Sequence, residues 1–397
     1  MKKISIYMSR VALLIGLCAC GACSSQTVKK EFPVIASQKD GLLTVDLMNV
    51  SGNTELKLSD IVSSIEIVQL EGDSSYMMFE RGQFQVSKNY ILIGREPKLF
   101  ERKTGKFITN VGAKGNGPGE YLMIYDSKIS EEDNRIFILP WNAKKILTYD
   151  LKGKYIGDIP LAYGVSKGKI HPNISQNEIT VMTLPFKSES IKIHPIWVQD
   201  TLGNIKHSID NNSHFVDLKP DFSNEITSGV SGDEYIYSLI NAANLPDTLY
   251  HYNAKTNTIS PTVNMYIREL KPTNGDYSKT IWNMICELPS MYVFNVSGTV
   301  KVGDGMYQGQ GGVTFMLYKD DLTGGGCTIV NDFLAGEKVQ AYTLSSGSEN
   351  HISILDPDYF EVAIENAEDD ETKERLIKLS ENINPNGNDI IVIGKYR

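Results

Sequence analysis

The sequence has few cysteines and lacks a hydrophobic segment long enough to cross a membrane. Five of its 397 residues are Cys, and three of these lie among the first 23. The strongest apolar run, residues 11–17, is much shorter than the roughly 20 residues that a membrane-spanning helix needs. Basic residues are outnumbered, with 39 Lys and Arg against 48 Asp and Glu. The resulting net charge of −9 argues against a nucleic-acid partner, because duplex binding needs clustered positive charge.

Motifs of the common catalytic and metal-binding classes are also lacking. Beyond residue 23 there is no Cys-x-x-Cys pair, and the chain has no His-Glu-x-x-His and no Gly-x-Ser-x-Gly sequence. The six His residues show no i, i+4 pairing of the kind that places two metal ligands on one helix face. We therefore assign no catalytic residue, no metal ligand and no cofactor from the sequence.

The N-terminus has the charged, apolar, small-residue order of an export signal. Residues 17–20, Leu-Cys-Ala-Cys, resemble a bacterial lipobox, in which a small residue precedes a Cys that is acylated before cleavage. That resemblance implies a lipoprotein signal peptide over residues 1–19, a lipid anchor at Cys20 and attachment to a membrane through that lipid. Cys23 is the alternative anchor, and an ordinary secretory signal is the alternative to a lipoprotein signal.

The rest of the chain is expected to consist of a polar spacer, residues 20–56, and a folded body, residues 57–397. Only two cysteines, Cys286 and Cys327, lie in this body. Export to an oxidising compartment permits a disulfide between them, whereas two buried free thiols are the more common arrangement in a chain of this size. Both alternatives stay open at this point.

One pattern recurs through the body: an alternating strand, a short turn with Gly or Asn, and a second alternating strand. Such a pattern is typical of a β-hairpin. It is clearest at residues 99–108 and 147–156, and weaker copies lie at 197–205, 249–259 and 316–324. The turns fall near residues 104, 152, 202, 256 and 322, with further strands expected at 64–70, 90–94, 135–139, 178–182 and 235–240. The repeat of around 50 residues is that of a four-stranded propeller blade.

The final segment, residues 331–397, leaves room for a sixth blade. It ends in a strongly apolar strand at 388–396, and residues 62–70 supply another strand near the start of the body. Pairing these two strands would close the ring and leave no open sheet edge. We therefore predict an all-β fold, a six-bladed β-propeller of four-stranded antiparallel blades closed by its N- and C-terminal strands. Short helices are expected to decorate it, one over 369–382 with an Asp cap and a smaller one over 278–288.

A glycine-rich segment at residues 112–121 points to a family. It contains Gly115, Gly117, Pro118, Gly119, Glu120 and Tyr121. The segment resembles the connection between blades of NHL-type β-propellers, in which an aromatic residue opens the inner strand of the next blade. Together with the lipobox and Asn384-Pro385 before the last strand, it makes the chain similar to the six-bladed propeller lipoproteins of Bacteroidota, in the NHL and TolB-like superfamily. This resemblance implies an outer-membrane lipoprotein of the cell envelope, facing the periplasm or the cell surface.

Two observations restrict what this resemblance implies. Pro140 and Ala143 stand where NHL blades commonly carry Asp and Asn, so the polar groups of that turn are not carried over. The glycines also invite comparison with a phosphate-binding loop, but no Lys-Ser or Lys-Thr follows them. A tight blade connection that needs positive φ explains them better.

The three tryptophans, Trp141, Trp197 and Trp282, could stack on a sugar ring at a loop face, or pack between blades. We favour a lipid-anchored, non-catalytic propeller that binds a glycan, a peptide or an envelope protein, with an accessory role in nutrient handling at the surface. The alternative is a propeller enzyme, such as a lyase, hydrolase or lactonase, with its site at the mouth of the central channel. Convergent carboxylates or His residues around that channel, together with a bound cation, would favour the enzyme, and an apolar or amide-lined face with exposed aromatics would favour binding.

Overall fold

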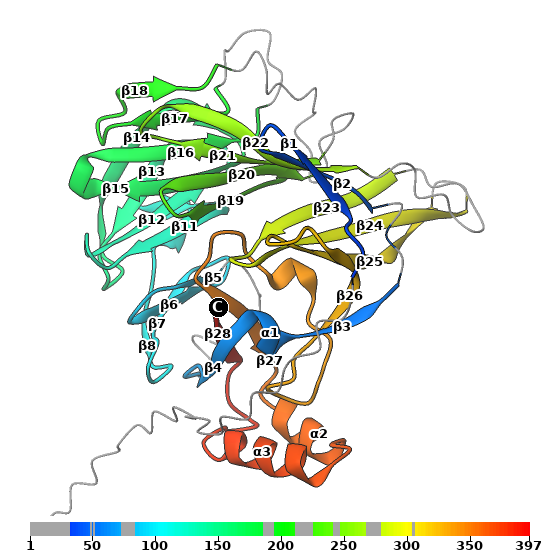
Figure 1. Ribbon diagram of the computed structural model, residues 1–397. Helices are drawn as coiled ribbons and strands as arrows, with labels where there is room; N and C mark the ends of the chain where they lie inside the picture. Colours follow the sequence, from blue (N-terminus) through cyan, green and yellow to red (C-terminus); the bar gives the residue numbers. More distant parts are fainter. Residues whose placement is uncertain are drawn as a thin grey trace, which may run out of the picture. The chain divides into compact units, whose positions relative to one another are not determined.

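The computed structural model describes residues 32–47, 50, 52–72, 84–185, 194–210, 225–240, 247–266, 279–303 and 306–397. The chain divides into two compact units, Met1–Phe32 and Pro33–Arg397. The second unit is all-β, and its six blades form a ring (Figure 1). The predicted fold class is therefore confirmed.

Three consecutive blades have the predicted four antiparallel strands, hydrogen-bonded in chain order. Blade 1 consists of β5 (Phe84–Val86), β6 (Tyr90–Ile93), β7 (Lys98–Glu101) and β8 (Phe107–Asn110). Blade 2 consists of β11 (Ile124–Ser130), β12 (Arg135–Pro140), β13 (Ala143–Tyr149) and β14 (Tyr155–Val165). Blade 3 consists of β15 (Gly168–Asn173), β16 (Glu178–Thr183), β17 (Ile196–Gln199) and β18 (Ile205–Ser208), with the 3-10 helix Ile174–Gln176 between its first two strands.

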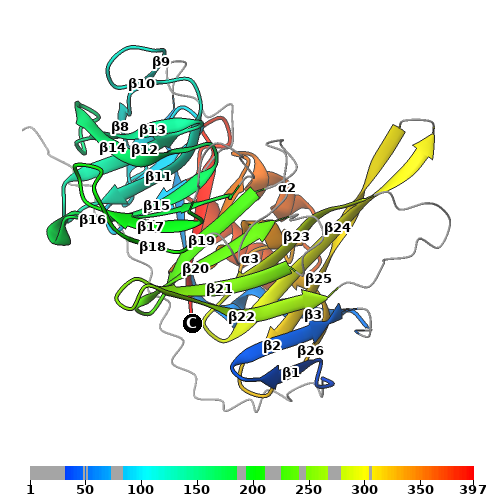
Figure 2. The same ribbon diagram turned by 90° about the horizontal axis from the view of Figure 1, so that it is seen from above.

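Blades 4 and 5 are enlarged by strands from the N-terminal part of the chain. Blade 4 contains β19 (Glu225–Ser231), β20 (Glu234–Ile240), β21 (Asp247–Asn253) and β22 (Thr258–Tyr266), followed outwards by β2 (Leu42–Asp46) and β1 (Ala36–Lys39). Blade 5 contains β23 (Lys279–Glu287), β24 (Met291–Gly303), β25 (Met306–Tyr318) and β26 (Gly324–Val330), followed by β3 (Thr54–Lys57). Figure 2 shows the hairpin of β24 and β25 extending beyond the neighbouring strands.

These added strands correct the expected boundary of the spacer at residue 56. β2 pairs in parallel with β22, and β3 pairs in parallel with β26. Val45 is fully buried, and Leu43 packs with it against Val263 of blade 4. Because an outer strand otherwise presents unpaired N–H and C=O groups, β2 and β3 cover edges that blades 4 and 5 would leave open.

Blade 6 confirms the predicted closure of the ring. It consists of β27 (Asn350–Leu355), β28 (Ile390–Tyr396) and β4 (Val62–Gln69), with β28 in the centre. The C-terminal strand thus pairs antiparallel with a strand from the start of the body. With three strands, this blade departs from the four that we predicted.

The helices are short and lie outside the blades. α1 (Leu58–Ile61) leads into β4, while α2 (Tyr359–Glu365) and α3 (Asp370–Ser380) separate β27 from β28 (Figure 1); a 3-10 helix covers Ala341–Thr343. α3 confirms the helix expected over 369–382, and the side chain of Asp369 accepts a hydrogen bond from the Thr372 backbone N–H at 2.7 Å, as an N-cap does. The helix expected over 278–288 is wrong, because residues 279–287 form β23 and pair antiparallel with β24.

All five predicted hairpin turns occur, each between the last two strands that a blade forms from its own repeat. Two of these turns are stabilised in the same way, by an Asp side chain that binds backbone N–H groups of its own turn. The Oδ1 atom of Asp150 accepts hydrogen bonds from the backbone N–H groups of Lys152 and Lys154, and Asp200 binds Leu202 and Asn204 in the same way. An Asp that binds its own turn is a local signal, which explains why these turns could be located from the sequence.

The two body cysteines are free and buried. Cys286 lies in β23 and Cys327 in β26, and two strands separate them in blade 5. Three strand spacings amount to about 14 Å, which is far beyond the reach of a disulfide. Of the two alternatives left open by the sequence, the structure therefore has the free thiols.

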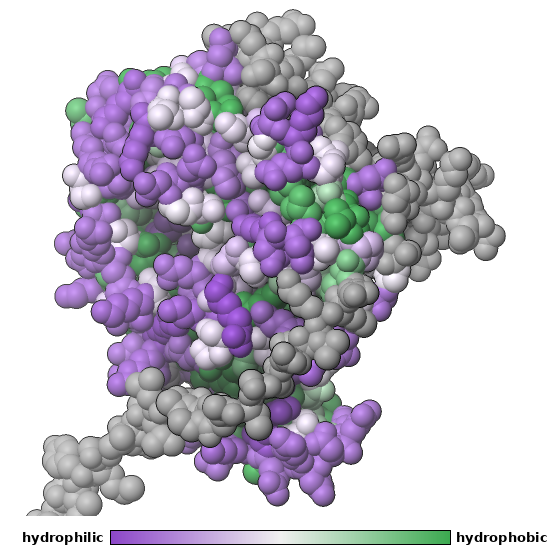
Figure 3. Space-filling view, in the orientation of Figure 1, coloured by the Kyte–Doolittle hydropathy of each residue, from purple (hydrophilic) through white to green (hydrophobic). Residues whose placement is uncertain are grey.

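The hydrophobic core lies in layers between the sheets. Ile91, Ile93 and Phe100 of blade 1 pack with Ile391 and Ile393 of blade 6, and similar clusters lie between other neighbouring blades. The face in Figure 3 is predominantly hydrophilic, and hydrophobic residues appear on it as small patches.

Candidate functional site

The first strands of blades 2, 3 and 4 bring polar side chains together at the centre of the ring. β11, β15 and β19 are each hydrogen-bonded on one side only, and β15 packs against both of the others. We call the polar residues that meet there the axial cluster: Tyr125, Asp126, Lys128, Lys167, Lys169, His171, Glu225 and Ser228. No other part of the described chain joins polar side chains of three blades in this way.

A β-bulge turns Tyr125 towards this cluster. The register between β11 and β12 shifts between Ile124 and Asp126, so that Tyr125 is left out of the ladder. Its hydroxyl donates a hydrogen bond to Glu225, which belongs to blade 4. Lys167, directly before β15, binds the same carboxylate at 2.9 Å. Glu225 of blade 4 therefore binds both blade 2 and the connection that leads into blade 3.

Asp126 is the second carboxylate of the axial cluster and is 2% exposed. Its Oδ2 accepts a hydrogen bond from the Ile170 backbone N–H at 2.9 Å, and its oxygens lie 3.5 Å from Lys169 Nζ and 3.9 Å from Lys128 Nζ. Burial alone would raise the pKa of Asp126, but the two ammonium groups and the Ile170 N–H outweigh it and hold the pKa below its ordinary value. Asp126 is thus a fixed anion between two blades.

Two further groups of the cluster are held in one protonation state near neutral pH. Burial, followed by the hydrogen bond to Glu225, raises the pKa of Tyr125, so its hydroxyl stays protonated. Burial and the nearby charge of Lys128 lower the pKa of His171 to about 3, so its ring stays neutral. The Nε2 atom of His171 lies 3.0 Å from Ser228 Oγ. Groups fixed in this way can hold a ligand but are poorly suited to moving protons at neutral pH.

An exposed apolar rim is connected to the axial cluster by backbone hydrogen bonds. Leu122, Met123 and Trp141 are 64%, 42% and 41% exposed, and the Trp141 N–H donates to the Met123 carbonyl at 2.9 Å. The next residue, Asn142, donates its N–H to the Ser166 carbonyl, and Lys167 of the axial cluster follows directly. Trp141 therefore lies on the loops that lead into the cluster.

The tryptophans do not form the single stacking surface that their number suggested. Trp197 is fully buried, donates its ring N–H to Gln199 Oε1 at 2.9 Å and packs edge-on against Tyr163, so ligand stacking is wrong for this residue. Trp282 lies in β23, and its side chain is outside the described residues. Trp141 alone, among the tryptophan side chains that the structure describes, is available to a ligand.

The glycine-rich segment connects the last strand of blade 1 to the first strand of blade 2, through β9 (Ala113–Lys114) and β10 (Glu120–Tyr121). Gly119 has φ +71°, whereas Gly115 and Gly117 lack positive φ and instead leave room for the Glu120 carboxylate. The Gly117 N–H donates to Glu120 Oε2 at 2.7 Å. Positive φ thus explains only part of this motif.

Tyr121 ends the segment and is buried, and its hydroxyl donates to the Val111 carbonyl at 2.8 Å. Beside it lies a pocket of about 250 Å³ lined by the side chains and backbone of blade 1 and of this segment: Glu96, Lys98, Asn110, Lys114 and Tyr121. The segment therefore shapes the surface next to the apolar rim.

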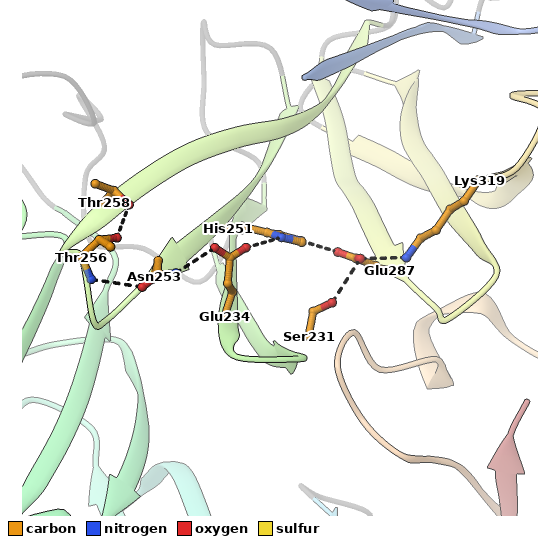
Figure 4. Close-up of polar contacts among 8 residues, drawn as sticks. All are labelled: Ser231, Glu234, His251, Asn253, Thr256, Thr258, Glu287 and Lys319. Carbon is orange, nitrogen blue, oxygen red and sulfur yellow. Dashed lines mark hydrogen bonds and ion pairs between the residues drawn. The ribbon is translucent and has the colours of Figure 1, made fainter. Parts of the chain in front are cut away.

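A second polar cluster joins blades 4 and 5 (Figure 4). His251 in β21 lies between two carboxylates, with Nε2 2.7 Å from Glu287 Oε2 and Nδ1 3.1 Å from Glu234 Oε2. Lys319 binds the other oxygen of Glu287 at 2.8 Å, and Asn253 binds Glu234. Burial raises the pKa of Glu287, but His251 and Lys319 outweigh it, so the pKa is lowered overall. We call this cluster, which joins blade 4 to blade 5, the His251 clasp.

We expect the His251 clasp to make the protein less stable at alkaline pH. The hydrogen bond to Glu287 is the largest cause that raises the pKa of His251, and the raised pKa means that the folded state favours the charged ring. The stabilisation is therefore present below about pH 6.5 and is lost as the pH rises through the raised pKa. His251→Gln should cost about 1.5 kcal/mol at pH 6 and much less at pH 9.

Urea unfolding of wild type and His251→Gln between pH 5.5 and pH 9 measures this difference. The lowered pKa values of His171 and His351 affect stability with the opposite sign, and they cancel in the comparison because both proteins keep these residues. A difference that does not change with pH would contradict the prediction.

The residues of the axial cluster were not recognised from the sequence, and Cys20 and Cys23 lie outside the described residues. One signal was present. Asp126 and Lys128 alternate along β11. Lys167, directly before β15, alternates with Lys169 and His171 within it, at positions where a buried strand would carry apolar residues. The described residues contain no group of three or more His, Cys, Asp or Glu side chains that could hold a metal ion. They also contain no helix that is both long and apolar enough to cross a bilayer.

Comparison with known proteins gives a family and a fold. A family model described as "Domain of unknown function (DUF4934)" matches residues 42–395. A Bacteroides fragilis NCTC 9343 protein described as exported is similar in structure, with a TM-score of 0.59 and 16% identity over 90% of this chain and 99% of that one. A DUF4221 member from Bacteroides vulgatus ATCC 8482 has a TM-score of 0.47 and 13% identity, over 85% and 97% of the chains. No curated protein matches the chain in sequence.

Proposed function

Since the chain belongs to the DUF4934 family, whose description assigns no activity, we propose its function from its own geometry: a cell-envelope propeller that binds a ligand without transforming it. The observation that carries this proposal is the axial cluster, in which Asp126 is held charged, Tyr125 protonated and His171 neutral. These fixed states suit recognition of a polar ligand at the end of the ring where the apolar rim lies.

Export to the envelope and a lipid anchor are part of the proposal. The charged and apolar N-terminus, the Leu-Cys-Ala-Cys sequence and the similarity in fold to a Bacteroides protein described as exported support it. The ligand is a glycan, a peptide or an envelope protein, and the role is accessory to nutrient handling at the outer membrane. Neither a cofactor nor a nucleic acid is required.

Labelling with a palmitate analogue tests the anchor. In cells of a Bacteroides host that express the full chain, we expect Cys20→Ala to abolish labelling and to release the protein from the membrane fraction, because the acylated thiol is missing. Cys23→Ala should keep both and serves as the matched control. Loss of labelling in Cys23→Ala but not in Cys20→Ala would place the anchor at Cys23. A wild-type protein that takes up no label would contradict a lipid anchor.

Binding is tested with the full-length protein in detergent against arrays of glycans and peptides, followed by mass analysis of each retained ligand. We expect a retained ligand to be recovered unchanged after long incubation. Cleavage or elimination products that depend on the protein would favour the propeller enzyme instead.

A further inference from the structure

The axial cluster has more basic than acidic side chains. Its two carboxylates, Asp126 and Glu225, face three lysines, and Glu225 is already bound by Lys167 and by the Tyr125 hydroxyl. Asp126 is left as the ionic partner of both Lys128 and Lys169. The protein as a whole is acidic, with a net charge of −9, so a local excess of basic side chains is unusual for this chain.

Lys128 has the weakest contacts of the three lysines. Its ammonium lies 3.9 Å from Asp126 Oδ2, beyond hydrogen-bond distance, and no other acceptor among the described residues binds it. The side chains of Lys128 and Lys169 are only 23% and 20% exposed. Burial lowers the pKa of Lys128, and the Asp126 carboxylate offsets this only in part, so an anionic ligand beside Lys128 would favour its charged form.

The surroundings indicate the kind of anion. Trp141 of the apolar rim offers an exposed aromatic face, and such a face suits the C–H surface of a sugar ring. The distance along β11 from Ile124, beside the rim, to Lys128 is about 13 Å at 3.3 Å per residue. Ser228 and His171 add polar groups along this wall. A ligand that spans the rim and Lys128 therefore has several units, of which at least one carries an acid.

We propose that the axial cluster binds an acidic oligosaccharide, with the carboxylate of a hexuronate residue between Lys128 and Lys169 and another sugar ring on Trp141. This inference rests on the proposed binding function and names its ligand class. Asp126 is a positioning residue in this site, because it holds both ammonium groups and is itself held by the Ile170 N–H.

Calorimetric titration of the full-length protein in detergent tests this assignment. The probes are hexuronate trimers with galacturonate, glucuronate or mannuronate units, each as the free acid and as the methyl ester, and poly-L-glutamate as an acidic peptide. Esterification removes the charge and keeps the sugar, so we expect at least one acid to bind at least tenfold more tightly than its ester. Its affinity should fall as salt is raised, because the contacts are ionic.

Three variants locate the site on the protein. Lys128→Met should weaken binding of that trimer at least tenfold, and Trp141→Ala should weaken binding of the trimer more than binding of the single hexuronate, which is titrated for comparison. Lys145→Met is the matched control, because Lys145 lies in the same blade, is 47% exposed and binds Asp158 at 2.6 Å outside the cluster. Circular dichroism of each variant shows that it is folded.

The failures of this inference and of the proposed function are distinguishable. If acid and ester bind equally, if Lys128→Met binds like wild type, or if poly-L-glutamate binds as tightly as every trimer, the ligand class is wrong. If the trimers do not bind while another glycan or peptide from the arrays does, the inference fails and the binding function stands. If nothing in the arrays binds, both fail.

Discussion

Replacing Ile391 with Ala is expected to lower the free energy of unfolding by about 3 kcal/mol. Ile391 is fully buried in β28, where its backbone pairs with Ile354 on one side and with Val68 of β4 on the other. Its side chain packs with Ile91 and Phe100 of blade 1. The substitution therefore removes methyl groups where the two ends of the ring meet, and it leaves a cavity that a closed ring cannot easily fill.

Urea unfolding of the full-length chain, followed by circular dichroism, measures this loss. Ile377→Ala is the matched control, since Ile377 lies on α3 with 47% of its surface exposed. We expect the control to change stability by less than about 0.5 kcal/mol. Equal effects of the two substitutions would mean that β28 does not close a cooperative ring.

The parts of this fold that the sequence predicts are those with local signals. Asp150 and Asp200 bind their own turns, so each hairpin is specified by a few neighbouring residues. The closing strand β28 is apolar and almost entirely buried, and β4 contributes the buried residues Val62 and Val68. Their pairing was predictable because a ring with open edges is unfavourable.

The errors occurred in strands whose own residues do not show that they form strands. β2 is short and parallel to β22, so Leu43 and Val45 show their buried role only once blade 4 is formed. β23 has buried residues on both faces, Ile285 and Cys286, and this removes the alternation that distinguishes a strand from a helix. Strands of this kind cannot be identified from residue order alone.

The candidate site was harder to predict than the fold for a related reason. The axial cluster combines the first strands of three repeats, and Tyr125 reaches it only because a bulge leaves it out of the ladder. Trp141 and Trp197 look alike in sequence, yet one is in a turn and the other is fully buried. Which polar residues meet depends on register, and register is a property of the assembled ring.

Gly105→Ala is expected to destabilise the protein by at least about 3 kcal/mol, because two costs combine. Gly105 lies in the turn between β7 and β8 with φ +68°, a conformation that Ala adopts only with strain. A Cβ atom there would also overlap the carbonyl oxygen of Gln69 at the end of β4. To relieve the overlap, the turn must move away from blade 6, and the hydrogen bond from the Glu71 N–H to the Gly105 carbonyl, now 2.7 Å, must lengthen.

A matched variant separates the two costs. Gly232 has φ +59° in the turn between β19 and β20, but a Cβ added there would have no atom within 4 Å. Gly232→Ala should therefore show the cost of positive φ alone, about 1 kcal/mol. The difference between the two variants in urea unfolding measures how tightly the turn of blade 1 is held against the strand that closes the ring. If both lose the same amount, the contact between Gly105 and Gln69 can relax freely, and closure of the ring does not constrain the turn of the neighbouring blade.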